Sequence, residues 1–254
     1  MSEVTRVVVD AMGGDYAPEW IIRGAVEAIN EGAKAQIILT GKEDVIKKEL
    51  AKYTYDQSKI EVLNATEEIT CHEAPVQAVR SKKDSSLVVG LNMVKNGEAD
   101  AIISAGSSGA ILAGGQLVVG RSKGVKRSPL APLLPTSKGY SLLIDCGANV
   151  DARPEHLLQF AKMLLGEIKN TIMSSFKTKI GGLLIKSSLN GLKERFNAKN
   201  KGGAPLLGLQ GLVVKIHGNS HNEEVKSAIF QCINFKENGV NEKIAENIGK
   251  EVAK

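Results

Sequence analysis

The sequence has few aromatic residues, few cysteines and no long apolar run. Aromatic residues make up 4% of the 254 positions, and there is a single tryptophan. Nucleic-acid-binding surfaces usually combine a basic patch with rings for stacking, so a net charge of +5 alone does not indicate one. No stretch reaches the roughly 18 consecutive apolar residues of a membrane-spanning helix. These absences argue against a nucleic-acid-binding protein and against an integral membrane protein.

The three cysteines, Cys71, Cys146 and Cys232, are far apart and form no CxxC or Cys/His ligand pair. A disulfide framework or a zinc site is therefore not expected, and we expect no bound metal. Lone thiols suit a reducing cytosol, and the N-terminus lacks the features of a signal peptide. We expect a cytoplasmic protein.

Three common catalytic or nucleotide-binding motifs are also missing. The loop after the first apolar strand is not GxGxxG, and no Walker A sequence occurs. No GxSxG nucleophile elbow is present either. The sequence thus gives no support to a dinucleotide-binding protein, a P-loop enzyme or a serine hydrolase.

Short β-branched runs alternate with helical patterns along most of the chain. We expect strands at 7–10, 36–40, 60–64, 99–104, 141–145 and 211–216. We expect helices at 18–29, 44–53, 75–82, 86–96, 110–121, 154–176 and from about 223 onward. This alternation predicts an α/β protein with a mostly parallel sheet and helices on both faces. The prolines at 132 and 135 indicate an extended segment over 130–135.

Small polar residues follow four of these strands, and the carboxyl ends of parallel strands meet at one edge of a sheet. They are Asp10, Gly13, Gly14 and Asp15; Gly106, Ser107, Ser108 and Gly109; Asp145, Gly147 and Asn149; and His217, Gly218 and Ser220.

The second loop is the most informative of the four. A strand followed by Gly-Ser-Ser-Gly and a helix places N–H groups and two hydroxyls where an anion can bind. A serine that only caps the helix is an equally good interpretation. Asp10 and Asp15 fit either a paired-carboxylate site or a turn, and His217 fits either an acid/base or phosphate-donor role or a loop histidine.

The segment 177–196 combines apolar and basic residues in a helical pattern interrupted by Gly181 and Gly182. Such a segment can lie in a membrane interface, or it can pack as a hairpin on the protein's own core or on a dimer partner. The residues we expect at a membrane interface are Ile180, Leu183, Leu184, Lys186, Leu189 and Lys193.

Several long motifs in order resemble the bacterial phosphate acyltransferase (PlsX) family of phospholipid synthesis. They are VDAMGGDYAP (9–18), EAPVQAVR (73–80), KKDSS (82–86), SAGSSGA (104–110), GR (120–121), DCGANVD (145–151), PEHL (154–157), GGAPLLG (202–208) and KIHGNS (215–220). The resemblance covers most of residues 4–235.

The resemblance implies transfer of a fatty acyl group from acyl carrier protein to inorganic phosphate, giving acyl phosphate. It further implies a fold similar to phosphotransacetylases and isocitrate dehydrogenases, no organic cofactor, a homodimer, and peripheral membrane association. Phosphate is itself the nucleophile, so the site has to hold it against the thioester and stabilise an oxyanion. We expect Ser107 and Ser108 to be donors, Asn149 and His217 polar contacts, and Asp15 an orienting group.

The chain departs from the family after Met163. The family continues there through segments of the type Gly-Thr-Glu…Gly-Asn-Glu-Leu-Thr-Lys and Asp-Gly-Phe-x-Gly-Asn, which are absent here. This predicts an internal deletion and three units: a core at 1–163, a helical hairpin at 164–200, and a segment at 201–254 that completes the core. Two alternative functions follow: a non-catalytic scaffold that binds membrane or partners, and a phosphotransacetylase that uses acyl-coenzyme A.

Overall fold

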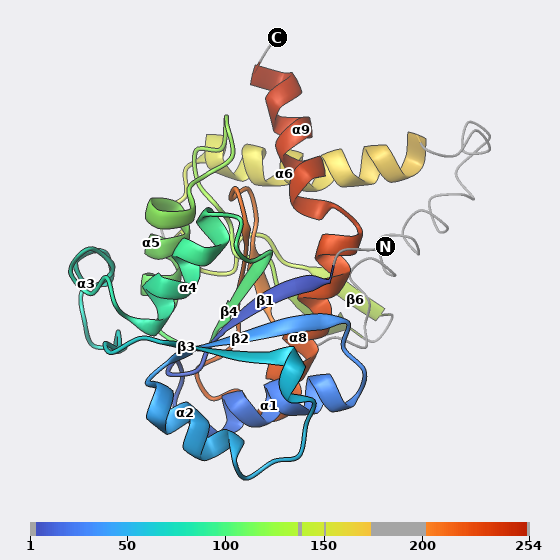
Figure 1. Ribbon diagram of the computed structural model, residues 1–254. Coiled ribbons are helices and arrows are strands. Elements are labelled where there is room, and N and C mark those ends of the chain that lie inside the picture. Colours follow the sequence, from blue (N-terminus) through green and yellow to red (C-terminus); the bar gives the residue numbers. More distant parts are fainter. Residues whose placement is uncertain (1–3, 137–138, 150, 174–201, 253–254) are drawn as a thin grey trace.

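The computed structural model describes residues 4–136, 139–149, 151–173 and 202–252. A six-stranded sheet with the order β3-β2-β1-β4-β8-β7 forms its centre (Figure 1). The strands β1 to β4 and β8 are parallel, and only the edge strand β7 is antiparallel to its neighbour. The expected α/β class with a mostly parallel sheet is confirmed.

The sheet is built from short apolar runs. Its strands are β1 (Thr5–Asp10), β2 (Ala35–Gly41), β3 (Ile60–Asn64), β4 (Ala101–Ser104), β7 (Ala204–Leu206) and β8 (Leu212–Lys215). The central strands are buried on both faces because helices cover both, which explains why they are continuous rather than alternating apolar runs.

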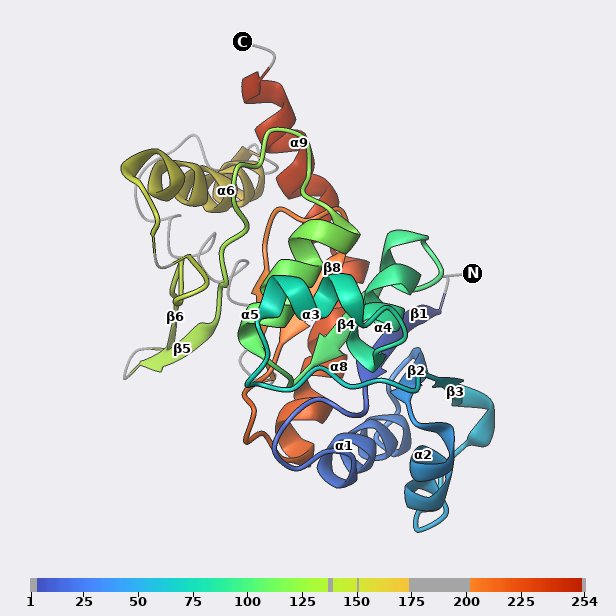
Figure 2. The same cartoon turned by 90° about the vertical axis from the view of Figure 1, so that its left-hand side faces the viewer.

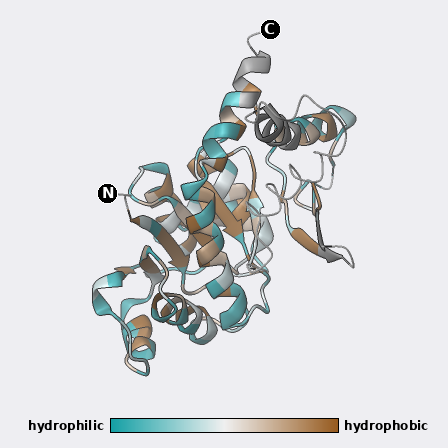
Figure 3. Cartoon of the chain, turned by 90° about the vertical axis from the view of Figure 1, so that its right-hand side faces the viewer, coloured by the Kyte–Doolittle hydropathy of each residue, from teal (hydrophilic) through white to brown (hydrophobic). Residues whose placement is uncertain are grey.

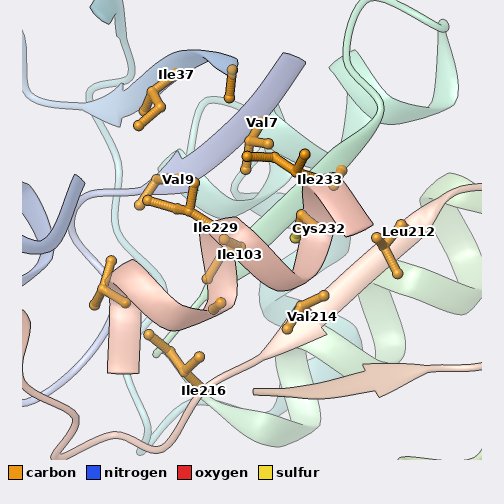
Figure 4. Packing of buried hydrophobic residues seen from close by; sticks show 14 of the residues in the cluster. Val7, Val9, Ile37, Ile103, Leu212, Val214, Ile216, Ile229, Cys232 and Ile233 are labelled. Carbon is orange, nitrogen blue, oxygen red and sulfur yellow. The ribbon is translucent and has the colours of Figure 1, made fainter. Parts of the chain in front are cut away.

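The helices form two layers, one on each face of the sheet, and each layer packs on the sheet through its own hydrophobic cluster. On one face, Val7, Val9 and Ile103 pack against α1 (Glu19–Asn30) and α8 (Asn222–Glu237) (Figure 4). This cluster also takes in residues of α2 (Glu43–Leu50) and α9 (Val240–Val252). The strands of the main sheet are coloured mostly toward the hydrophobic end of the scale in Figure 3.

The other face is covered by α3 (Pro75–Ser81), α4 (Ser86–Lys95) and α5 (Ser108–Gly114). Val8 and Ile102 point to this side, as the two-residue period of a strand requires. A π turn at Gly115–Val119 follows α5, and a short 3₁₀ turn at Gln57–Lys59 precedes β3.

One strand expectation is wrong. The run 141–145 is not part of the six-stranded sheet: β6 (Gly139–Leu142) pairs antiparallel with β5 (Leu133–Thr136) in a separate two-stranded ribbon. The segment 130–135 is extended as expected. It lies just before β6 in the chain, and β5 within it pairs with β6. In Figure 2 the ribbon lies apart from the main sheet, on the same side of it as α6 (Pro154–Met173).

Other differences concern boundaries. The helix expected at 44–53 ends at Leu50, and the one expected at 110–121 consists of α5 and the π turn. The strand β7 was not expected, because Pro205 lies in it and a three-residue strand leaves almost no periodic pattern.

Within the part of the chain that the structure describes, no helix is long and apolar enough to cross a bilayer. The hairpin expected at 177–196, with its interfacial residues, lies outside the described residues. The division of the chain at 163 and 200 stays a prediction.

Candidate active site

Three neighbouring strands, β1, β4 and β8, end together at Asp10, Ser104 and Lys215. The Ser104 hydroxyl donates to Asp10 Oδ2 at 2.7 Å and accepts the Gly106 N–H at 3.0 Å. The Met12 N–H reaches Asp10 Oδ1 at 3.3 Å. A buried carboxylate thus connects the loop after β1 to the loop after β4.

This connection leaves no room for a side chain at position 13. A Cβ on Gly13 would lie 2.6 Å from Asp10 Oδ2 and 2.9 Å from the Gly106 nitrogen. Burial raises the pKa of Asp10, and hydrogen bonds from the Ser86 and Ser104 hydroxyls offset part of that effect. The glycine is therefore needed so that the two loops can approach each other closely.

The loop after β8 joins the same cluster. The Asp15 N–H donates to the Gly218 carbonyl at 2.8 Å, and the Ile216 N–H donates to the Ser104 carbonyl at 3.0 Å. Gly14 has a φ of 111°, and a Cβ there would lie 2.8 Å from Ala105 Cβ. The predicted meeting of the first, second and fourth loops is thus present in the structure.

Lys215 is the most unusual residue of the site. It is 8% exposed, although it carries an ammonium group at the end of a central strand. Its Nζ donates to the Ile216 carbonyl, and among the described residues no carboxylate forms an ion pair with it. Burial lowers its pKa, while the charges of Cys71 and Asp15 act in the opposite direction. A buried cation in this state is a strong binding group for an anion.

Lys215 lines a cavity of about 340 Å³. The cavity lies between the first turns of α5, the loop 146–148 and the edge strand β7. Its lining consists of Ser108, Gly109, Ile111, Leu112, Leu130, Cys146, Gly147, Ala148, Leu206 and Lys215. A serine, a lysine and several aliphatic residues therefore line the same cavity.

Comparison with known proteins identifies the family. A family model described as a fatty acid synthesis protein matches residues 5–166 and 162–243. Phosphate acyltransferases of Clostridium novyi and Clostridium tetani are 38% and 36% identical to this chain, over 96% of it and 98% of their own length. The chain belongs to the phosphate acyltransferase family.

The alignments to this family contain an internal gap. Each of these two extends over 326 positions, whereas the chain has 254 residues, so at least 72 positions carry no residue of this chain. The family model matches in two parts that meet at residues 162–166. Both findings agree with the deletion expected after Met163.

Solved structures support the same fold. A phosphotransacetylase from Streptococcus pyogenes aligns with a TM-score of 0.59 at 16% identity, covering 93% of this chain and 95% of its own. The EutD phosphotransacetylase from Staphylococcus aureus aligns with a TM-score of 0.55 at 14% identity, covering 91% and 93%. The phosphotransacetylase fold expected from the resemblance is confirmed.

The two serines of the acyltransferase loop 106–109 have different surroundings. Ser107 is the N-cap of α5, and its hydroxyl accepts the Ala110 N–H at 3.4 Å. Ser108 is exposed and lines the cavity together with Gly109. Of the two serines, Ser108 lines the cavity and Ser107 does not.

The loop 145–149 reaches the cavity, although it does not follow a strand of the main sheet. Asp145 accepts the Leu130 and Asn149 N–H groups, each at 2.7 Å. The Asn149 side chain donates to the Ser128 carbonyl at 3.0 Å and is 7% exposed. These two side chains hold the loop in shape, and it is Gly147, with its neighbours 146 and 148, that lines the cavity.

His217 is exposed, and its Nδ1 accepts the Asn219 N–H at 3.4 Å. Ser220 is buried, and its N–H donates to the His217 carbonyl at 3.1 Å. Neither residue lines the cavity. They lie in the loop that contacts Asp15, at the margin of the site.

The sequence patterns assign no role to Lys215, Leu112 or Leu130. Ser104 is the polar residue at the end of the expected strand 99–104 and the first residue of the motif SAGSSGA. Lys215 gives one signal, since a lysine inside the apolar run 212–216 departs from the pattern of a buried strand. The two leucines give none, because their position depends on pairing between distant segments.

Proposed function

We propose that this acyltransferase moves an acyl group from a carrier-protein thioester to inorganic phosphate in the cavity beside Lys215. The observation that carries the proposal is the buried ammonium of Lys215, which lines a partly aliphatic cavity at the carboxyl ends of β4 and β8. A phosphate ion would supply the negative charge that this ammonium lacks among the described residues. Membership in the phosphate acyltransferase family supports the same reaction.

The chemistry needs no enzyme nucleophile. A phosphate oxygen attacks the thioester carbonyl, the tetrahedral intermediate carries the negative charge on the former carbonyl oxygen, and the C–S bond breaks. The leaving thiolate takes up the proton that the hydrogen phosphate loses, so the products are acyl phosphate and a free thiol. Lys215 holds the phosphate, and the Ser108 hydroxyl at the start of α5 stabilises the oxyanion.

The remaining site residues act by holding the loops. Asp10 and Ser104 fix the loop that carries Ser108, and the contact of Asp15 with Gly218 fixes the loop after Lys215. Asp145 and Asn149 fix the wall at Gly147. His217 is exposed two residues after Lys215, at the margin of the site.

We further propose acyl carrier protein as the donor, a homodimer as the working form, and peripheral attachment to a membrane that uses the acyl phosphate for phospholipid synthesis. These proposals rest on the resemblance of the sequence motifs. The segment that would contact the membrane, with Ile180 and Lys186 among its residues, lies outside the described ranges.

The test is formation of acyl phosphate by purified protein, trapped as hydroxamate, with acyl carrier protein thioester and phosphate. Lys215→Met should lower kcat/KM for phosphate at least about 30-fold, the equivalent of ~2 kcal/mol for a charged hydrogen bond. Lys34→Met, which removes an exposed lysine in the loop before β2, serves as the control. Equal activity of Lys215→Met and the control would refute the proposed role of Lys215.

A second candidate is a phosphotransacetylase that takes acyl-coenzyme A, and the likeness to phosphotransacetylase structures favours it. Comparing kcat/KM for the two donors decides between them. A third candidate is a scaffold without catalytic turnover, because the chain lacks part of the sequence that its relatives contain. Folded protein that binds vesicles but forms no hydroxamate with either donor would support that candidate.

A further inference from the structure

Four exposed leucines lie on the part of the molecule that is formed by α6 and the β5–β6 ribbon. Leu134, Leu143, Leu157 and Leu158 are 42%, 41%, 52% and 58% exposed, and they make up half of the large hydrophobic residues that are exposed within the described ranges. The ribbon and α6 lie on the same side of the main sheet (Figure 2). A single exposed leucine needs no explanation, but several on consecutive elements indicate a surface that binds another molecule.

On α6, the exposed leucines lie away from the side that packs on the protein. Phe160 and Met163 are 1% and 0% exposed, and α6 contacts α9. Leu157, Leu158 and Ala161 are exposed and lie at least about 120° around the helix axis from Met163, since 3.6 residues complete one turn. The helix is therefore apolar on two sides, and the described part of the chain covers only one of them.

The ribbon has the same two-sided character. Leu133 lies opposite Leu142 in the pairing, and Leu142 packs against the hydrophobic core. Leu134 and Leu143 belong to the other face, as the two-residue period of a strand requires. Within the described residues neither strand pairs with a third one, so each has an edge with no strand beside it. A two-stranded ribbon is marginally stable by itself, and a further strand would stabilise it.

The gap in the alignments to the family falls next to this surface. The two parts of the family match meet at residues 162–166, inside α6 and within two turns of Leu157 and Leu158. At least 72 positions of the relatives have no counterpart in this chain. A stretch of that length can form several strands and helices of average size. The uncovered surface and the missing positions thus occur at the same point of the chain.

We propose that the outer faces of α6 and the β5–β6 ribbon bind a separate polypeptide that carries the family positions missing from this chain. The partner adds a strand to an edge of the ribbon through main-chain hydrogen bonds and packs apolar side chains on the four exposed leucines. The site therefore recognises one kind of partner, a chain of this family's own sequence. This inference does not depend on the proposed acyl transfer.

The test coexpresses the full chain with a probe, namely the stretch of the Clostridium novyi phosphate acyltransferase that aligns with no residue of this chain. Coexpression allows the probe to fold on its partner, so it need not fold alone. The two should purify together in equal amounts. Leu157→Asp combined with Leu158→Asp should lower the amount of bound probe at least tenfold, the equivalent of ~1.4 kcal/mol. Failure of the unchanged chain to bind the probe would overturn the proposal.

The matched control is Leu117→Asp. Leu117 is 50% exposed and lies in the π turn after α5, outside the proposed surface, so binding should change less than twofold. Every replaced leucine is exposed, and urea midpoints close to that of the unchanged protein should show that the variants fold. An equal loss of binding in the control and in the double variant would contradict the assigned surface.

Hydrogen exchange locates the contact. The probe should slow exchange of amides in 133–136 and 139–142 at least tenfold, because a third strand would pair with the ribbon. Protection that is confined to the main sheet would overturn the proposal.

Two other occupants can be recognised with the same variants. If the unchanged chain forms a dimer that the double variant Leu157→Asp and Leu158→Asp dissociates, a second copy covers this surface and the proposal is wrong. If the unchanged chain binds anionic vesicles and the double variant does not, a membrane covers it and the proposal is equally wrong. A complex with the probe that forms no acyl phosphate would refute the proposed function and leave this inference standing.

Discussion

Substituting Gly13 by alanine tests the close contact between the loops after β1 and β4. A Cβ there would lie 2.6 Å from Asp10 Oδ2, 2.9 Å from the Gly106 nitrogen and 3.0 Å from the Ser104 hydroxyl. Overpacking of this kind costs about 1–3 kcal/mol, and losing the Ser104–Asp10 bond adds about 1.5–3 kcal/mol. Alanine lowers the conformational entropy of the unfolded chain relative to glycine, and this offsets roughly 0.4–1 kcal/mol of the loss. We expect a net loss of about 1.5–5.5 kcal/mol.

The measurement is the free energy of unfolding from urea titration, together with Tm, which should fall by roughly 3–20 °C. Gly218→Ala is the matched control, because its Cβ would make only ordinary contacts, the nearest at 3.4 Å from Asp15 Oδ2. That variant should stay within about 1 kcal/mol of the unchanged protein. If Gly13→Ala is as stable as Gly218→Ala, the contact between Asp10, Ser104 and Gly106 is not what requires the glycine.

Three further outcomes follow from buried ionisable groups. Burial lowers the pKa of Lys215, so the unfolded chain binds more protons than the folded protein between that lowered pKa and 10.5. The free energy of unfolding should therefore rise with pH in this window. Urea titrations at a series of pH values should show this rise in the unchanged protein and not in Lys215→Met. Burial raises the pKa of Asp10, so the free energy of unfolding should fall as pH rises from 3.8 through the raised pKa. If Asp10→Asn shows the same dependence of stability on pH, this assignment is wrong. Burial also raises the pKa of the Cys232 thiol, so a disulfide reagent should titrate two thiols, Cys71 and Cys146, quickly and the third only after denaturation.

The central sheet could be predicted from the sequence because its strands have a strong local signal. The β-branched runs that form β1, β2 and β3 are bounded by turn residues, and their ends were located within one or two residues. Parallel strands buried on both faces cannot be confused with alternating amphipathic ones. The meeting of the loops at Asp10, Gly106 and Gly218 followed from this topology alone.

The parts that could not be predicted depend on pairing between distant segments. Whether the run at 141–145 joins the main sheet or a ribbon depends on its partner, and a short apolar run carries no information about that. For the same reason, nothing in the sequence near Leu130 showed that it pairs with Leu206 and lines a cavity. The role of Ser107 as a cap, which sequence analysis left open, required the geometry of α5.

The antiparallel direction of β7 has a consequence for how this family can change over evolution. Parallel neighbours need a crossover connection, usually a helix, but β7 and β8 are joined by a short turn. The segment 129–131 bonds through main-chain atoms to Pro205 of β7 and to Leu207. The Cys146 N–H donates to the Leu130 carbonyl, and Leu130 and the segment 146–148 line the cavity. Side chains in these segments can be exchanged without disturbing the strand register. Selection on the shape of the cavity can thus act on a few loop positions while Lys215 and the sheet stay as they are.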